Sequence, residues 1–198
     1  MKVAEMARRM IATTVGLMLY AGLATPAAAA NRSIADAVRS LRDRFCSPVS
    51  FIVRRGEDEL VEDVALGATI GDALSAIAHQ TAHYKLELIN DRYVLYPVEP
   101  EYGRAVEGVA IEQLPRIEAA DAYVNLLRAR NIFPDLVSAP IIGDDRAAAY
   151  RDKVTLRPAG RVIDQLIDIL GKDQSLFMEI FYAPTGRPYI VFGNPRCK

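Results

Sequence analysis

The residues with the clearest potential for chemistry are His79 and His83, which are four positions apart and are the two histidines of the chain. On one face of a helix, this spacing can hold a metal ion. A zinc site usually has three or four protein ligands, and no Glu, Asp or Cys nearby in the sequence completes the set. We therefore interpret both histidines as surface residues at the end of a helix, and we predict neither a metal nor a cofactor.

Asp72 and Asp164 recur at the same place in a repeated segment, and two carboxylates can act as an acid–base pair. Each, however, falls near the first turn of a predicted helix, where the helix dipole favours a negative charge. Cys46 with a distant histidine could form a nucleophile and base, but the start of the chain, described below, predicts export, and an exported chain with two cysteines does not favour that role. We therefore predict no catalytic residue and no enzyme activity. The alternative is an envelope hydrolase with an unrecognised site.

A run of acidic residues follows the first predicted strand. It contains Glu57, Asp58, Glu59, Glu62 and Asp63. Carboxylates are calcium ligands, but the spacing here is not that of a calcium-binding loop. The run therefore predicts a solvated turn.

The two cysteines, Cys46 and Cys197, could form a disulfide. In an oxidising compartment, pairing is the ordinary outcome. This bond would close nearly the whole mature chain, and the chain-entropy model gives about 5 kcal/mol as an upper figure for its contribution. The alternative is two unpaired thiols, one at a helix end and one in a loose tail. No C-x-x-C is present, so a redox role is not predicted.

The first thirty residues have the layout of a secretory signal peptide. A basic start, an apolar run over 10–24 and an A-x-A site that ends at Ala30 follow one another. A membrane-spanning helix needs roughly 20 apolar residues, and neither this run nor a later one is that long. We therefore predict cleavage after about Ala30, and a periplasmic or secreted mature chain that does not span a membrane.

Charge excludes two classes of partner. Without residues 1–30, the chain has 21 basic and 24 acidic residues. Binding to nucleic acid depends on a basic patch, which this balance gives no reason to expect. The same balance gives no reason to expect binding to anionic lipid.

The elements that must position these residues are predicted by an internal repeat. Ile70, Asp72, Leu74 and Ile77 match Val162, Asp164, Leu166 and Ile169, which lie 92 positions later. With the same offset, Leu86, Glu87 and Leu88 match Met178, Glu179 and Ile180. Asp121 and Leu126 repeat the spacing of Asp36 and Leu41, with an offset of 85. We interpret the pattern as the duplication of a small helix-on-sheet unit.

Apolar spacing and capping residues predict the elements of each half. The predicted helices are 34–45, 70–80, 118–130 and 162–170. The predicted strands are 49–53, 60–66, 84–89, 92–96, 106–111, 136–142, 154–156, 176–182 and 189–192. Two helices in each half must cover a small sheet. The predicted fold class is therefore α+β, with two small tandem helix-on-sheet modules over 31–97 and 105–198 and a linker over 98–104.

Five tyrosines fall on the predicted hairpins: Tyr84, Tyr93, Tyr96, Tyr182 and Tyr189. Most are expected in the core or on a sheet face. Tyrosine on an open face is also a good contact residue for a partner protein.

The order helix, strand, strand, helix, hairpin, with the segment VEDVALGATIGDALSAIAHQTAHYKLELINDRYVLYPV, resembles the secretin and TonB short N-terminal (STN) domain. Val64, Leu66 and Gly67 match the strand and its end, and Thr69, Ala73 and Leu74 match the start of the helix. Thr81-Ala82-His83 stands where the family has Thr-Gly-Leu. The resemblance covers 33–98, and 118–192 resembles the family more loosely through DKVTL, VIDQLIDIL and FMEIFY.

The resemblance implies a periplasmic protein-interaction module without catalytic residues. In larger relatives, the domain precedes an outer-membrane channel or barrel and contacts proteins on the inner-membrane side, for signalling or assembly. For this chain, we expect a free-standing adaptor for an envelope protein partner. A structural subunit of a secretion or pilus assembly is a further alternative.

Overall fold

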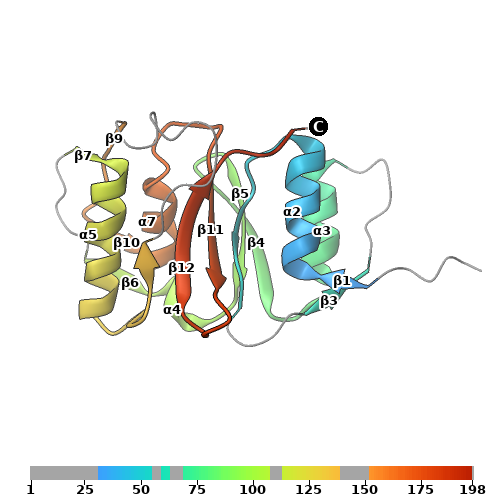
Figure 1. Ribbon diagram of the computed structural model, residues 1–198, viewed down its shortest axis with the longest axis horizontal. Helices are drawn as coiled ribbons and strands as arrows, with labels where there is room; N and C mark the ends of the chain where they lie inside the picture. Colours follow the sequence, from blue (N-terminus) through green and yellow to red (C-terminus); the bar gives the residue numbers. More distant parts are fainter. Residues whose placement is uncertain (1–30, 55–58, 63–68, 108–112, 139–151, 198) are drawn as a thin grey trace, which may run out of the picture. The chain divides into compact units, whose positions relative to one another are not determined.

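A mixed six-stranded β-sheet forms the centre of the fold in the computed structural model (Figure 1). The structure describes residues 31–54, 59–62, 69–107, 113–138 and 152–197. The predicted signal peptide (1–30), much of the acidic run and the motif residues Val64, Leu66 and Gly67 lie outside these ranges. Residues 31–198 make up one compact unit.

The elements of the first half are β1 (Arg32–Ser33), α2 (Ile34–Phe45), β2 (Ser50–Ile52), β3 (Leu60–Val61), α3 (Ile70–His79), β4 (Tyr84–Ile89) and β5 (Arg92–Pro97). The second half contains α4 (Pro100–Gly103), β6 (Ala105–Glu107), β7 (Leu114–Pro115), α5 (Arg116–Ala129), β8 (Val137–Ser138), β9 (Lys153–Val154), β10 (Ala159–Arg161), α7 (Val162–Asp168), β11 (Phe177–Tyr182) and β12 (Pro188–Gly193). The four predicted helices are present, and the ends differ from the prediction by at most two residues.

Strands from both halves share the central sheet, in the order β4-β5-β2-β11-β12-β8. β4 pairs with β5, and β11 with β12, as antiparallel hairpins. β2 lies between the hairpins and runs parallel to both β5 and β11. The predicted α+β class is confirmed. The predicted division into two modules is not shown, because one continuous sheet contains strands of both halves.

The order of elements nevertheless repeats along the chain. Each half has a short strand, a helix, two strands, a second helix and a hairpin, and the second half has β10 in addition, directly before its second helix. In each half, the short first strand pairs with the second strand after the first helix, as β1 with β3 and β7 with β9. Within the sheet, β11-β12-β8 repeats the order of β4-β5-β2, but each strand runs in the opposite direction to its counterpart. The pair β6–β10 belongs to the second half alone among the described residues.

This reversal places the two pairs of helices on opposite faces of the sheet. Successive side chains of a strand point to opposite faces. Phe51 packs in the cluster that contains the α2 and α3 side chains, whereas its neighbour Ile52 packs in the cluster of α5 and α7. In Figure 1, α2 and α3 accordingly lie on one side of the sheet, and α5 and α7 on the other.

Local signals in the sequence explain several boundaries. The Ser33 side chain caps α2 by accepting a hydrogen bond from the Asp36 N–H at 3.1 Å. Asn90 and Asp91 have φ of 50° and 60°, as a two-residue hairpin loop requires. Gly171, with φ of +61°, follows α7 closely. The predicted linker 98–104 contains α4, whose Tyr102 is 1% exposed.

Candidate functional site

Two glutamates at the same position of the repeat connect the halves. Glu179 on β11 is 4% exposed. Its Oε1 accepts a hydrogen bond from Arg39 Nε at 2.9 Å, and its Oε2 accepts one from Arg42 Nη1 at 3.2 Å. Both arginines belong to α2 of the first half, and the Arg42 guanidinium lies 3.4 Å from the centre of the Phe177 ring. The second hairpin is thus fixed to the first helix by a buried, charge-assisted contact.

Glu87 on β4 makes the reciprocal contact. Its carboxylate accepts hydrogen bonds from Arg161 Nη1 at 3.3 Å and Nη2 at 2.9 Å, and Arg161 immediately precedes α7 of the second half. Burial raises the pKa of Glu87, but hydrogen bonds from Arg161 and Lys85 outweigh this effect and lower the pKa to about 2. Glu87 therefore stays ionised at neutral pH and serves as an anchor for Arg161.

Two buried arginines surround the C-terminal end of α7. Arg92 and Arg116 are 2% and 1% exposed. Arg92 Nη1 donates to the Gly171 carbonyl at 3.0 Å, and Arg116 Nη2 donates to the Leu170 carbonyl at 3.3 Å. Both carbonyls belong to the turn after α7, which ends at Asp168 with Ile169 as its C-cap. Both arginines thus hold the turn that follows α7.

A cavity of about 800 Å³ adjoins this end of α7. Its lining includes the cationic residues Arg116, Lys153 and Lys172 and the acidic residues Asp91, Asp152, Asp168 and Asp173. Arg116 Nη2 lies 3.4 Å from Asp152 Oδ2, and Asp168 accepts a hydrogen bond from Arg157 Nε at 2.6 Å. The opposite charges largely compensate one another, so the lining offers no clear excess of charge to a small ion.

The histidines do not share a helical face, because α3 ends at His79 and His83 follows it. His79 Nδ1 lies 2.6 Å from the Ser75 carbonyl oxygen. His83 Nε2 lies 4.0 Å from Glu59 Oε1. Within the described ranges, no three side chains of His, Cys, Asp or Glu are grouped so that they could hold a metal ion.

Asp72 and Asp164 each act at the start of a helix. Asp72 N–H donates to Thr69 Oγ1 at 3.2 Å, and Thr69 N–H donates to Asp72 Oδ2 at 3.4 Å, which together form a capping box. Asp164 accepts hydrogen bonds from Arg161 Nε at 2.9 Å and Nη2 at 2.7 Å. The two carboxylates therefore have structural partners in separate helices.

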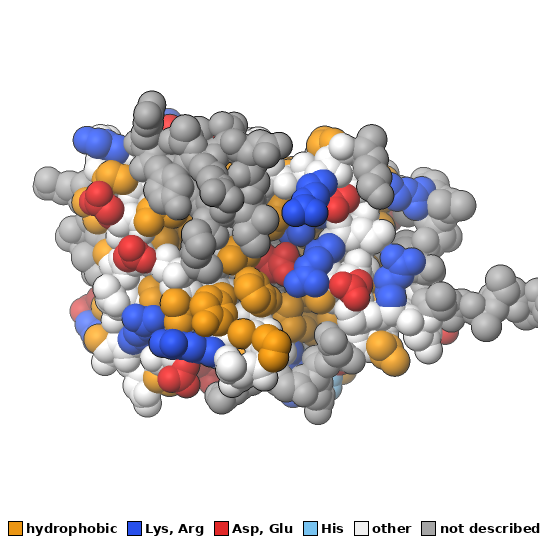
Figure 2. Space-filling model, viewed as in Figure 1, with side chains coloured by type: hydrophobic (Ala, Val, Ile, Leu, Met, Phe, Trp, Pro, Cys, Tyr) orange, Lys and Arg blue, Asp and Glu red, His pale blue; other side chains and the backbone are white. Residues whose placement is uncertain are grey.

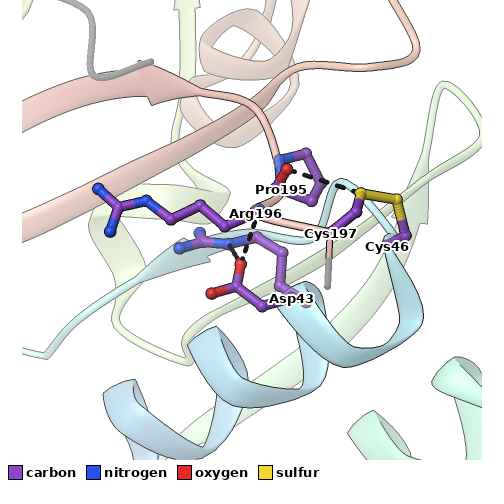
Figure 3. The surroundings of a disulfide bond; sticks show 6 residues. Asp43, Cys46, Pro195, Arg196 and Cys197 are labelled. Atoms are coloured by element: carbon purple, nitrogen blue, oxygen red, sulfur yellow. Dashed lines mark hydrogen bonds and ion pairs between the residues drawn. A yellow bond between two sulfur atoms is a disulfide. The ribbon is translucent and has the colours of Figure 1, made fainter. Parts of the chain in front are cut away.

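The structure joins Cys46 and Cys197 in a disulfide, with the Cα atoms 5.0 Å apart (Figure 3). Cys46 ends α2 in the left-handed conformation, with φ of 50°. The chain after β12 reaches this helix end, where the Arg196 N–H donates to Asp43 Oδ1 at 3.1 Å. The bond uses both sulfur atoms, so neither is a free nucleophile.

Most of the hairpin tyrosines are core or sheet-face residues. Tyr84 and Tyr96 are 5% and 4% exposed, and burial raises the pKa of Tyr84 to about 12. Tyr189 is partly exposed and stacks on Phe181, with ring centres 5.8 Å apart. Figure 2 shows hydrophobic side chains gathered on the visible face over β11 and β12.

The spacing of the candidate catalytic and metal-binding residues did not predict the exposed edge of β4. In the part of the chain that the structure describes, β4 ends the sheet and pairs with β5 on one side only. Leu88 on this strand is 61% exposed. A free edge with an exposed leucine can pair with another strand. In the sequence, the residue that could have indicated this edge is Leu88, which occupies the same position in the repeat as Ile180.

Comparisons with protein-family models, curated proteins and solved structures found no match for this chain. Among the described residues, no helix combines the length and the apolar character needed to cross a membrane.

Proposed function

We propose that the mature chain is an exported protein-interaction module without catalytic activity, acting as an adaptor or as a signalling or assembly component of an envelope transport or secretion system. The observation that carries the proposal is the sheet that is open at both ends. Among the described residues, β4 and β8 each have a neighbouring strand on one side only. A free edge can accept a strand from another protein.

The resemblance to the STN domain supports the same role. The order helix, strand, strand, helix, hairpin occurs in the first half, and in the second half with β10 as an additional strand before α7. The resemblance implies a domain that contacts other proteins in the periplasm. A partner among envelope proteins is therefore the most economical choice.

The cysteines support export. Disulfides persist in oxidising compartments and are rare in the bacterial cytosol. The bond between Cys46 and Cys197 connects the end of α2 with the C-terminal residues. A periplasmic or secreted location agrees with the pattern of residues 1–30.

The alternative, an envelope hydrolase, has weaker support. Asp72 and Asp164 are held at two helix starts. Both cysteines are in the disulfide. His79 and His83 do not share a helical face. The side chains that could have formed a nucleophile and base thus have other partners or lie apart.

The test is capture of the partner from the envelope. A C-terminally tagged full chain is produced in its natural host, and proteins retained from the envelope fraction are identified by mass spectrometry. The matched control lacks residues 1–30, so it stays in the cytoplasm. We expect an envelope protein that is retained by the exported chain and that captures it in the reciprocal experiment. Failure to retain any envelope protein reciprocally under several conditions would contradict the proposal.

A further inference from the structure

The duplication allows the free edge of β4 to be compared with its counterpart, β11. Leu88 of β4 and Ile180 of β11 are 92 positions apart and occupy the same place in the repeat. Leu88 is 61% exposed, whereas Ile180 is 1% exposed. The same position is therefore covered in one half and open in the other.

Strand β2 lies along the edge of β11. Ile52 is the register partner of Ile180, and both side chains belong to one buried cluster. The Val53 N–H donates to the Ile180 carbonyl at 2.9 Å. Strand β2 on the edge of β11 thus shows how a parallel strand binds to an edge of this kind.

The backbone of β4 presents the same groups outward. In a hairpin with a two-residue loop, Ile89 and Arg92 form the closing hydrogen-bonded pair, and bonded pairs then recur at every second residue. The Val98 N–H accordingly donates to the His83 carbonyl at 2.9 Å. By this alternation, the N–H and C=O groups of Leu86 and Leu88 point away from β5. Their counterparts in β11 are Met178 and Ile180, the residues to which β2 binds.

We propose that the edge of β4 binds an extended segment of a partner protein, which runs parallel to β4 in the register that β2 has on β11. The proposal rests on the proposed function and names the surface that carries it. The partner segment places an aliphatic side chain beside Leu88, as Ile52 lies beside Ile180. The side chains before and after it point to the opposite face, where Lys85 and Glu87 favour polar groups.

Lys85 makes this edge selective. It takes the place of Phe177 in the repeat, and its side chain is 53% exposed. A lysine on an edge strand discourages indiscriminate pairing with other sheets. The partner segment therefore needs polar or acidic groups near Lys85 in addition to the aliphatic anchor.

The test uses a synthetic peptide with the sequence PESTITR, which copies residues 48–54 with polar residues in place of Val49, Phe51 and Val53, the positions that would face Lys85 and Glu87. It is titrated to about 1 mM, enough to detect millimolar binding, into the ¹⁵N-labelled oxidised chain 31–198. We expect the amide signals of Leu86 and Leu88 to shift and those of β8 to stay unchanged. A peptide with aspartate in place of isoleucine should not produce the shifts.

Leu88→Pro removes the outward N–H of β4 without removing a hydrogen bond to β5. We expect it to weaken peptide binding about tenfold. Leu88→Ser, a milder change that should leave the fold intact, is compared with Leu60→Ser, because Leu60 is 64% exposed on β3. We expect roughly fivefold weaker binding for Leu88→Ser and no change for Leu60→Ser. Unchanged Leu86 and Leu88 signals, or equal effects of the two serine variants, would overturn the proposal.

Envelope capture distinguishes this proposal from the broader function. If the wild-type chain and folded Leu88→Pro retain a partner equally, the proposed function as an interaction module would stand, but the proposed role of the β4 edge would be overturned. Specific binding of the peptide to β4, with no envelope partner found, would support strand binding at the β4 edge and contradict the proposed function as an envelope interaction module.

Discussion

Replacement of Glu179 should show how strongly the two halves are held together. The Glu179 side chain is 5% exposed, and that of its partner Arg42 is 8% exposed. Removal of one member of a buried pair leaves an unpaired charge and destabilises a protein by about 3–5 kcal/mol. Asp43 Oδ1 remains 4.0 Å from Arg42 Nε and compensates in part. We therefore expect Glu179→Ala to lower the free energy of unfolding by about 3 kcal/mol.

The chain contains no tryptophan, so urea unfolding is best followed by far-UV circular dichroism with the disulfide intact. A loss of about 3 kcal/mol corresponds to a thermal midpoint roughly 6–12 °C lower for a chain of this size. Glu87→Ala is the matched control at the same repeat position. Its partner Arg161 is 38% exposed and keeps Asp164, so no buried charge is left unpaired and we expect a smaller loss than for Glu179→Ala.

A second variant separates the unpaired charge from a general loss of packing. Glu179→Leu combined with Arg42→Met removes both charges and keeps apolar volume, and we expect it to recover most of the lost stability. If Glu179→Ala loses no more than Glu87→Ala, the argument that Arg42 depends on a buried carboxylate is refuted.

Three further predictions concern other contacts. The pKa of Glu87 is lowered from 4.5 to about 2 in the folded chain, so its stabilising contribution is complete above pH 4.5 and is lost as the pH falls towards 2. The difference in free energy of unfolding between the wild type and Glu87→Gln, measured in urea, should therefore shrink over this range. A difference that stays constant with pH would contradict this prediction. Replacing Cys46 and Cys197 by serine should lower the free energy of unfolding by up to about 5 kcal/mol. The wild type in reductant should then have the same urea midpoint as the double variant. If reductant leaves the urea midpoint of the wild type unchanged, the result would count against the disulfide. Gly171→Ala should lose more stability than Gly186→Ala, because both positions have positive φ (+61° and +76°) but only the Cβ at 171 meets a close atom, Val154 Cγ1 at 2.8 Å. Backbone strain costs about 1–2 kcal/mol in either variant. Equal thermal midpoints would therefore exclude a role for the Val154 contact.

Sequence patterns predicted the second helix and the hairpin of each half because these segments are long and periodic. The first helices were harder to align. Their starts, Ile34 and Arg116, are 82 positions apart, whereas the spacing of Asp36 and Asp121 suggested 85. A shift of three residues is nearly one helical turn, so the apolar face looks much the same in either alignment.

The pairing of β2 could not be read from the sequence. All three residues of β2 are buried, so the strand lacks the alternation that would reveal its faces and neighbours. The partners of the two glutamates are also distant in the chain, with Glu179 and Arg39 140 positions apart. The repeated glutamate in an otherwise apolar strand was visible, but its role depends on the pairing of β2 with β11.

The pairing of β2 with β11 joins two similar halves through unlike surfaces, one edge of each. A head-to-tail contact that does not close into a ring leaves one surface of each kind unused at the ends. Among the strands that the structure describes, the unused surfaces are the edge of β4, which matches β11, and the edge of β8, which matches β2. β8 spans only Val137–Ser138 among the described residues, whereas β4 spans six residues and carries the exposed Leu88. The edge of β4 is therefore the better placed of the two to bind another chain, and the charge of Lys85 limits what can bind there.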